Sequence, residues 1–244
     1  MLTDQEIGVF RQDIIENMSF ETDITIRFSD TLRMAEKVKA LAKQDHAAFL
    51  DLCTKLLMDE DKEVRLGLLH ILSHYAQREP VLTQLLIGSP FMDSVVEDKA
   101  LLNETLCALA RIGTRDALPT LYRYALTGSE CALRGFGWLV RTEREVQVAI
   151  RIARTYLTSP EYSLRETALF LLQRRSAIEK EEELILEAVR LYKDELFIEA
   201  LREATPQNIL PRLKEIAATL PERSAEFDDL SKAIAILEQR MEKE

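Results

Sequence analysis

The chain has 244 residues, and 47% of them are hydrophobic, enough to fill the core of one large domain or two small ones. Its 42 acidic and 32 basic residues give a net charge of −10, which argues against a general affinity for nucleic acid or anionic membranes. No secretory signal and no apolar stretch as long as a membrane span is evident, so we expect a cytoplasmic protein. Seven glycines and seven prolines among abundant Leu, Ala, Glu and Arg favour an all-α protein.

Apolar residues recur every three or four positions along most of the chain, which is the spacing of amphipathic helices. The first two predicted helices lie between residues 27 and 58 and meet near Asp45. The segment 22–27 alternates β-branched residues, and we interpret it as a loop or a helix start rather than a strand. Further helices are predicted over residues 62–77, 99–111, 116–126, 130–140, 143–157 and 161–173, and four more segments follow, the last over 224–241.

Local signals mark several helix ends. Thr142 and Glu145 fit a capping box, in which each side chain bonds an amide at the start of the helix. Ser159 and Pro160 place a hydroxyl at the N-cap and a proline at the first helical position. Three glycines at predicted helix C-termini are expected to adopt the left-handed conformation that ends a helix: Gly88, Gly113 and Gly128.

The three cysteines, Cys53, Cys107 and Cys131, are odd in number and far apart. Their spacing fits neither a zinc site nor a disulfide framework. We therefore expect all three to be reduced core residues.

A short unit recurs along the chain, consisting of a turn, an apolar residue, an arginine and an apolar helix. Residues 61–72 and 160–172 are the clearest copies, and 130–140 form a third. The arginine positions and their weaker counterparts are separated by 38, 31, 31 and 34 residues: Arg65, Asn103, Arg134, Arg165 and Glu199. These spacings suit a pair of short helices that stacks on the next pair, because neither helix can bury its apolar face alone.

The segment Asp59-Glu-Asp-Lys-Glu-Val-Arg65 resembles the HEAT repeat, in which an acidic turn precedes a Val-Arg pair that opens the second helix. Gly113-Thr-Arg-Asp-Ala-Leu-Pro119-Thr-Leu resembles the first helix of that repeat. The resemblance implies an all-α fold, a right-handed α-α superhelix (α-solenoid) of stacked antiparallel helix pairs, with the repeat arginine paired to a turn carboxylate. A single domain over 1–244 would then have three parts: N-terminal capping helices at 1–44, repeats at 45–205 and C-terminal capping helices at 206–244.

Charge is distributed unevenly along the chain. Residues 1–110 carry 11 basic and 19 acidic groups, and residues 176–244 carry 10 and 17. Between them, residues 111–175 hold eleven arginines, no lysine and six carboxylates. Arginine binds carboxylate or phosphate through two parallel hydrogen bonds and keeps its charge when partly buried, so this segment suits anion recognition.

Three of these arginines, Arg144, Arg151 and Arg154, share one face of the helix predicted over 143–157. One interpretation is that the arginines of this segment pair with nearby carboxylates and form an ordinary solvated face. The other is a basic concave patch that binds an acidic protein segment or a phosphate backbone. The candidate patch for this second role comprises Arg134, Arg141, Arg144, Arg151, Arg154 and Arg165.

No pattern indicates catalysis or a bound cofactor. His70 and His74 have the spacing of two metal-binding imidazoles, but no glutamate lies between them and no third ligand is assignable, so we expect no metal. Neither a phosphate-binding glycine loop nor a nucleophile elbow is present. We interpret Gly135 and Gly137 as allowing close helix packing, and Trp138 beside them as a core residue.

These observations predict a non-catalytic protein-interaction scaffold or adaptor that binds an acidic protein partner on its arginine-rich centre, away from membranes. Its oligomeric state stays open. Nucleic-acid binding is an alternative, since HEAT-like DNA glycosylases, similar to this chain in architecture alone, cradle duplexes in a basic concave face. Another is a bacterial immunity or inhibitor protein whose acidic surface neutralises a basic toxin or nuclease. A HEAT-like lyase that attaches a chromophore is compatible with the fold alone.

Overall fold

The computed structural model describes residues 2–17, 24–75, 77–174, 181–203, 206–222 and 224–242; for 24–29, 203 and 206 only the backbone is described. Throughout this described part, every regular element is a helix, which confirms the predicted all-α class. The chain divides into two compact units, Met1–Val140 and Arg141–Glu244. Each unit is a stack of helix pairs.

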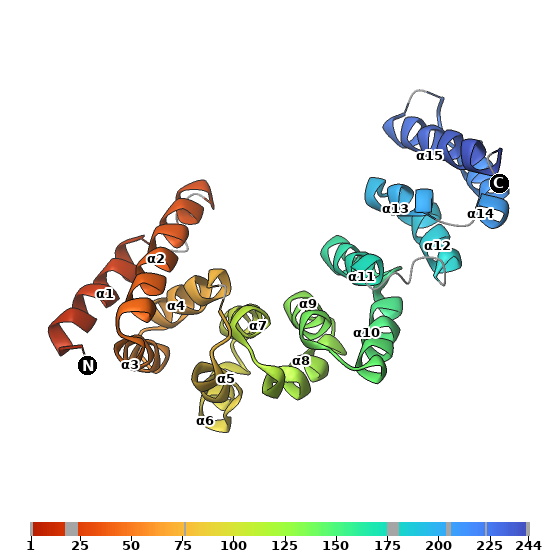
Figure 1. Ribbon diagram of the computed structural model, residues 1–244. Coiled ribbons are helices and arrows are strands. Elements are labelled where there is room, and N and C mark those ends of the chain that lie inside the picture. Colours follow the sequence, from red (N-terminus) through yellow and green to blue (C-terminus); the bar gives the residue numbers. More distant parts are fainter. Residues whose placement is uncertain are drawn as a thin grey trace. The chain divides into compact units, whose positions relative to one another are not determined.

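The first unit consists of helices arranged in two layers (Figure 1). Helices α4, α7 and α9 pack side by side in one layer, and α3, α5 and α8 cover them from the other. The first two helices, α1 and α2, pack against α4 and close the N-terminal end. The bounds are α1 Asp4–Asn17, α2 Ile24–Gln44, α3 His46–Leu57, α4 Lys62–His74, α5 Pro80–Ile87, α6 Ser89–Val95, α7 Lys99–Ile112, η1 Arg115–Ala117, α8 Leu118–Ala125 and α9 Glu130–Leu139.

The second unit repeats the same arrangement. Helix α11 packs against α10 and α13, and α13 packs against α12 and α15. Helices α12 and α14 lie together in the layer opposite α13 and α15. The bounds are α10 Glu143–Tyr156, α11 Tyr162–Arg174, α12 Glu182–Tyr192, α13 Glu195–Ala200, η3 Leu201–Glu203, α14 Pro206–Ala217 and α15 Ala225–Met241.

Side-chain caps begin many of these helices. Asp45 separates α2 from α3, as predicted, and its carboxylate accepts a hydrogen bond from the amide of Ala48 at 2.9 Å. Residues 24–27 belong to α2, so the described part of the segment 22–27 is a helix start. The Ser159 prediction was wrong by two residues, because α11 begins at Tyr162 and Pro160 precedes it.

Two further expectations needed correction. Of the three glycines predicted to be left-handed, Gly128 has φ 85°, whereas Gly88 and Gly113 have φ −66° and −60°. The sequence pattern also missed α5 and α6, both short helices that begin with a proline in their first turn. The extra helix α6 lengthens the repeat that ends in α7, which explains the long spacing of 38 residues between Arg65 and Asn103.

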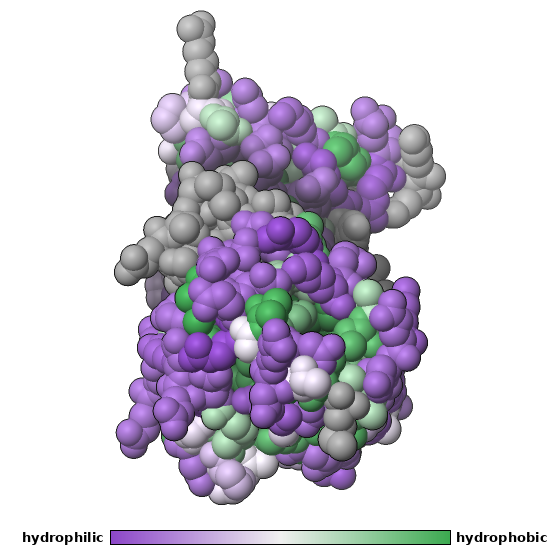
Figure 2. Space-filling view, turned by 90° about the vertical axis from the view of Figure 1, so that its left-hand side faces the viewer, coloured by the Kyte–Doolittle hydropathy of each residue, from purple (hydrophilic) through white to green (hydrophobic). Residues whose placement is uncertain are grey.

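Apolar side chains fill the space between the layers of each unit, including Phe49 and Phe91 in the first and Phe197 in the second. Figure 2 shows the face of the molecule at the α1 side, where hydrophilic residues dominate and apolar ones appear between them. None of the described helices combines the length and apolar character that crossing a bilayer requires.

Candidate binding surface

Helix α10 carries most of the predicted arginine patch. Its buried residues are Ala149, Ile152 and Ala153, on the side that packs against α11. The small alanines allow close approach of the two helices, and the polar side chains occupy the opposite side. This strongly amphipathic pattern holds the outer face of α10 in a defined orientation.

The start of α10 is fixed by the predicted capping box, which the structure confirms. The amide of Glu145 donates to Thr142 Oγ1 at 3.3 Å, and the amides of Thr142 and Arg141 donate to Glu145 Oε2 at 3.0 and 2.8 Å. The carboxylate of Glu145 therefore accepts hydrogen bonds from backbone amides at the start of the helix.

Arg144, Arg151 and Arg154 lie on the solvent side of α10, and we call these three residues the arginine face. Within the described part of the chain, no ion pair or hydrogen bond involves the side chains of Arg144 and Arg151. At 1.5 Å of rise per residue, their positions along the helix differ by about 10 Å. The side chains of Arg144 and Arg151 are thus exposed and, among the described residues, not ion-paired, as a surface for anions would require.

Arg154 has a carboxylate beside it. Its Nε lies 2.8 Å from Glu181 Oε2, and the Glu181 side chain is only 4% exposed whereas that of Arg154 is 51% exposed. Burial raises the pKa of Glu181, and the charge of Arg154 opposes this effect. The pair joins α10 to the turn before α12 and leaves half of the Arg154 side chain accessible.

Arg165 has a different environment from the other predicted patch residues, because it is buried at 4% exposure. Its Nε and Nη2 donate to Asp194 Oδ2 at 2.9 and 2.7 Å, and its Nη1 donates to the carbonyl oxygens of Ser159 and Pro160. The guanidinium also lies over the ring of Tyr192, 3.8 Å from the centroid. This is the arginine–turn carboxylate pair that the repeat resemblance implies, and the structure gives Arg165 a role in holding adjacent repeats together.

Arg134 belongs to the first unit and pairs with Glu130 one turn earlier on α9. Arg141 precedes α10 and is exposed. The six predicted residues thus fall into three groups. Arg141 and the arginine face are exposed, Arg134 on α9 is paired with Glu130, and Arg165 on α11 is buried in an ion pair with Asp194. The arginine face therefore does not include Arg134 or Arg165, which are already paired with carboxylates.

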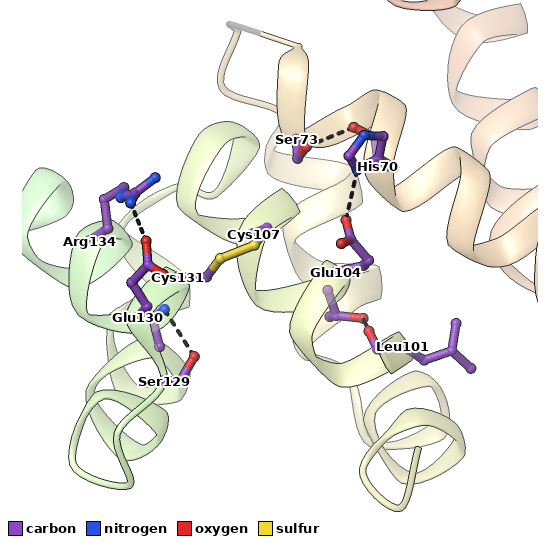
Figure 3. Close-up of a disulfide and its surroundings, with 11 residues drawn as sticks. His70, Ser73, Leu101, Glu104, Cys107, Ser129, Glu130, Cys131 and Arg134 are labelled. Atoms are coloured by element: carbon purple, nitrogen blue, oxygen red, sulfur yellow. Dashed lines mark hydrogen bonds and ion pairs between the residues drawn. A yellow bond between two sulfur atoms is a disulfide. The ribbon is translucent and has the colours of Figure 1, made fainter. Parts of the chain in front are cut away.

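The expectation that all cysteines are reduced was wrong for two of them. Cys107 on α7 and Cys131 on α9 form a disulfide, with their Cα atoms 4.9 Å apart, while Cys53 is a buried free thiol. Figure 3 shows the disulfide bridging the two helices, with Glu104 one turn before Cys107 and Arg134 one turn after Cys131. The two cysteines are 24 residues apart in a sequence without other cysteine pairs, so their spacing alone did not signal the bond.

Helices α7 and α9 also touch through Gly135. A Cβ atom at this position would lie 2.7 Å from Ala110 Cβ, so only glycine fits without movement. This confirms the prediction that Gly135 permits close packing.

His70 and His74 on α4 lie beside each other. Their rings lie edge to face with centroids 5.2 Å apart, and His70 Nδ1 lies 3.2 Å from Glu104 Oε2 on α7 (Figure 3). Burial lowers the pKa of His74, and the positive charges of His70 and Arg111 add to the effect. Among the residues that the structure describes, no three or more His, Cys, Asp and Glu side chains are placed to hold a metal ion.

Trp138, predicted to lie in the core, is only partly buried. The guanidinium of Arg111 on α7 lies over its ring, 5.0 Å from the centroid. This cation–π contact between α7 and α9 stabilises both groups.

A buried carboxylate that no sequence motif marks lies at the start of α5. Glu79 is 4% exposed, and its Oε1 accepts a hydrogen bond from the hydroxyl of Tyr75 at 3.2 Å. The other oxygen lies 3.1 Å from His46 Nε2. Burial, together with the charge of Glu79, raises the pKa of Tyr75 to about 12.

Comparisons with known proteins find similarity to solved structures. No protein-family model and no curated protein matches it. A solved complex of CpcE and CpcF of phycocyanin lyase from Nostoc sp. PCC7120 is similar with 13% identity and a TM-score of 0.45, covering 97% of this chain and 95% of that chain. A designed armadillo repeat protein has 14% identity and a TM-score of 0.41, with 95% and 99% covered. An engineered protein has 15% identity and a TM-score of 0.41, with 95% and 97% covered. Such low identities and TM-scores say nothing of this chain's ligands, partners or activity.

Proposed function

We propose that this protein is a non-catalytic interaction scaffold whose arginine face on α10 binds an acidic segment of a protein partner. The observation that carries the proposal is the exposure of Arg144 and Arg151 on a rigidly capped helix, with no carboxylate paired to either in the described part of the chain. A guanidinium that is free of internal partners binds carboxylates without first breaking an ion pair.

The geometry suits an extended or helical segment that carries several carboxylates. Arg144 and Arg151 lie about 10 Å apart along α10, and Arg154 lies one further turn beyond Arg151. A partner with aspartates or glutamates at a similar spacing would engage the three guanidinium groups together. Because the face is solvent-exposed, salt would weaken the contact strongly.

The test is a binding titration with a fluorescent glutamate-rich peptide. We expect the wild type to bind it in low salt and the Arg144→Glu/Arg151→Glu/Arg154→Glu variant to bind at least about a hundredfold more weakly, since each lost charge-assisted contact is worth about 1 kcal/mol or more at such a surface. Arg190→Glu is the control, because Arg190 is also exposed, on α12, but already pairs with Glu187. Equal weakening by the control, or full binding by the triple variant, would contradict the proposal.

Phosphate-backbone binding remains the alternative with the same chemistry. Short duplex DNA is therefore included as a competitor in the same titration. Displacement of the peptide by DNA with a steep salt dependence would favour the nucleic-acid function over the protein partner.

The cytoplasmic location stays a prediction. A disulfide between Cys107 and Cys131 is more typical of oxidising compartments than of a reducing cytosol. The redox state of this cysteine pair in intact cells is therefore the measurement that checks the location.

A further inference from the structure

The second unit has a groove on the layer opposite α10, lined by both apolar and polar side chains. The groove, of about 310 Å³, runs between α11 and α13, and we call it the α11–α13 groove. Leu169, which is 3% exposed, forms its floor, while Phe170 and Leu196 are 50% and 37% exposed. Its lining residues are Glu166, Leu169, Phe170, Gln173, Leu196 and Glu199.

Two of the exposed large apolar side chains, Phe170 and Leu196, lie together at this groove. Phe170 follows Glu166 by one helical turn on α11, and Tyr162, 49% exposed, precedes it by another. The exposed side chains of Phe170 and Leu196 would gain free energy by leaving water, at about 25 cal/mol per Å² of apolar surface. Apolar surface that is rimmed by polar residues marks many protein interaction sites.

Charge at the groove has one sign. The lining residues that carry charge are the carboxylates of Glu166 and Glu199, and no lining residue is basic. Glu199 lies 3.4 Å from Arg202 and is partly compensated, whereas no ion pair in the described structure involves Glu166. A partner that fills the groove with an acidic side chain would therefore meet repulsion, and one with a basic side chain would meet attraction.

We propose that the α11–α13 groove binds an amphipathic helical segment of a partner protein, which inserts bulky apolar side chains beside Phe170 and Leu196 and places lysine or arginine against Glu166 and Glu199. The volume is at the small end of the range of about 300–1,000 Å³ for ligand pockets, which suits one or two inserted side chains rather than a large cofactor. Helices that dock in such grooves present apolar anchors at i, i+3, i+4 and i+7.

This binding is separate from the proposed function of the arginine face. The groove lies between α11 and α13, whereas the arginine face lies on α10, and the two sites prefer partners of opposite charge. The protein would then bring a basic helical segment and an acidic segment together on one unit.

The experiment uses the full chain and two labelled peptides, with fluorescence anisotropy as the readout. Both peptides carry leucines at i, i+3, i+4 and i+7 in an alanine background; one has lysines at the remaining outer positions and the other has glutamates. We expect the lysine peptide to bind and the glutamate peptide to bind at least about tenfold more weakly. The Phe170→Ser/Leu196→Ser variant should lose about tenfold or more in affinity for the lysine peptide.

A second pair of variants separates charge from apolar contact. Glu166→Gln/Glu199→Gln should weaken binding of the lysine peptide severalfold and reduce its dependence on salt. The matched controls change exposed residues elsewhere: Val81→Ser/Leu126→Ser for apolar loss and Glu222→Gln/Glu226→Gln for charge loss.

Four results would overturn the inference: no binding of the lysine peptide, equal binding of both peptides, unchanged affinity in the groove variants, or equal losses in the controls. Circular dichroism confirms that each variant is folded. The Arg144→Glu/Arg151→Glu/Arg154→Glu variant should still bind the lysine peptide, so failure of the arginine-face proposal would leave this result intact.

Discussion

Removal of the disulfide between Cys107 and Cys131 should destabilise the first unit by about 3.5 kcal/mol. The bond joins two residues that are 24 positions apart in the sequence and closes a loop that contains the end of α7, η1, α8 and the start of α9. In the chain-entropy description, a crosslink over a loop of this length reduces the entropy of the unfolded chain by about 12 cal/mol/K, or about 3.5 kcal/mol at 25 °C. Packing of Gly135 against Ala110 is independent of the bond, so the reduced protein should still fold.

The assay is urea unfolding followed by tryptophan fluorescence. Trp138 is the single tryptophan of the chain and lies on α9, so it reports on the first unit. With a denaturant slope of about 2 kcal/mol/M, the Cys107→Ser/Cys131→Ser variant should unfold at a urea concentration lower by about 1.5–2 M. Reductant should lower the midpoint of the wild type by a similar amount and should not affect the double variant.

Cys53→Ala provides the control, because it removes a thiol that is outside the bond. This variant should keep the full response to reductant whatever its own stability. A wild-type midpoint that does not move on reduction would refute the reasoning, as would a reductant response that persists in the double variant.

Three further predictions concern packing and ionisation. Gly135→Ala should destabilise the protein by about 1 kcal/mol, because the new Cβ would overlap Ala110 on α7. Gly8→Ala should stabilise the protein by about 0.5 kcal/mol, because no atom lies within 4 Å of a Cβ at this position and alanine favours the helix. Thermal unfolding of the two variants measures both effects. Arg165→Met should cost about 3 kcal/mol, since it leaves Asp194 without its partner, and retention of wild-type stability in urea would contradict this. Tyr75 has a pKa of about 12 in the folded protein and about 10 in the unfolded chain. Its contribution to the free energy of unfolding is therefore complete below pH 10 and is lost as the pH rises toward 12. In urea unfolding, Tyr75→Phe should make the loss of stability between pH 10 and pH 12 smaller.

Helices were largely predictable because their signals are local. Apolar spacing located α3, α4 and α7 to within a few residues, and the capping box at Thr142 fixed the start of α10. Short helices such as α5 and α6 are stabilised by the layer they cover rather than by their own length, so periodicity over eight residues or fewer was too weak a signal.

The candidate surface was less predictable, because exposure depends on contacts between distant segments. The candidate patch included both Arg151 and Arg165, yet the two differ in the structure. Arg165 is buried in an ion pair with Asp194, 29 residues further along the chain, as the repeat resemblance implied, whereas Arg151 is exposed. The groove beside Phe170 likewise requires α13 to lie next to α11. Spacing along one helix carries no information about such neighbours.

Because Cys53 is buried, the reactivity of its thiol reports on local opening of the fold. The thiol is 0% exposed on α3, and burial, with a smaller effect of the charge of Glu79, raises its pKa far above the usual value. Because the thiolate is the form that alkylating reagents attack, the folded protein should react slowly at this position. After reduction, Cys107 and Cys131 should be alkylated first, and the rate at which a third label is added would report how often the core around Cys53 opens.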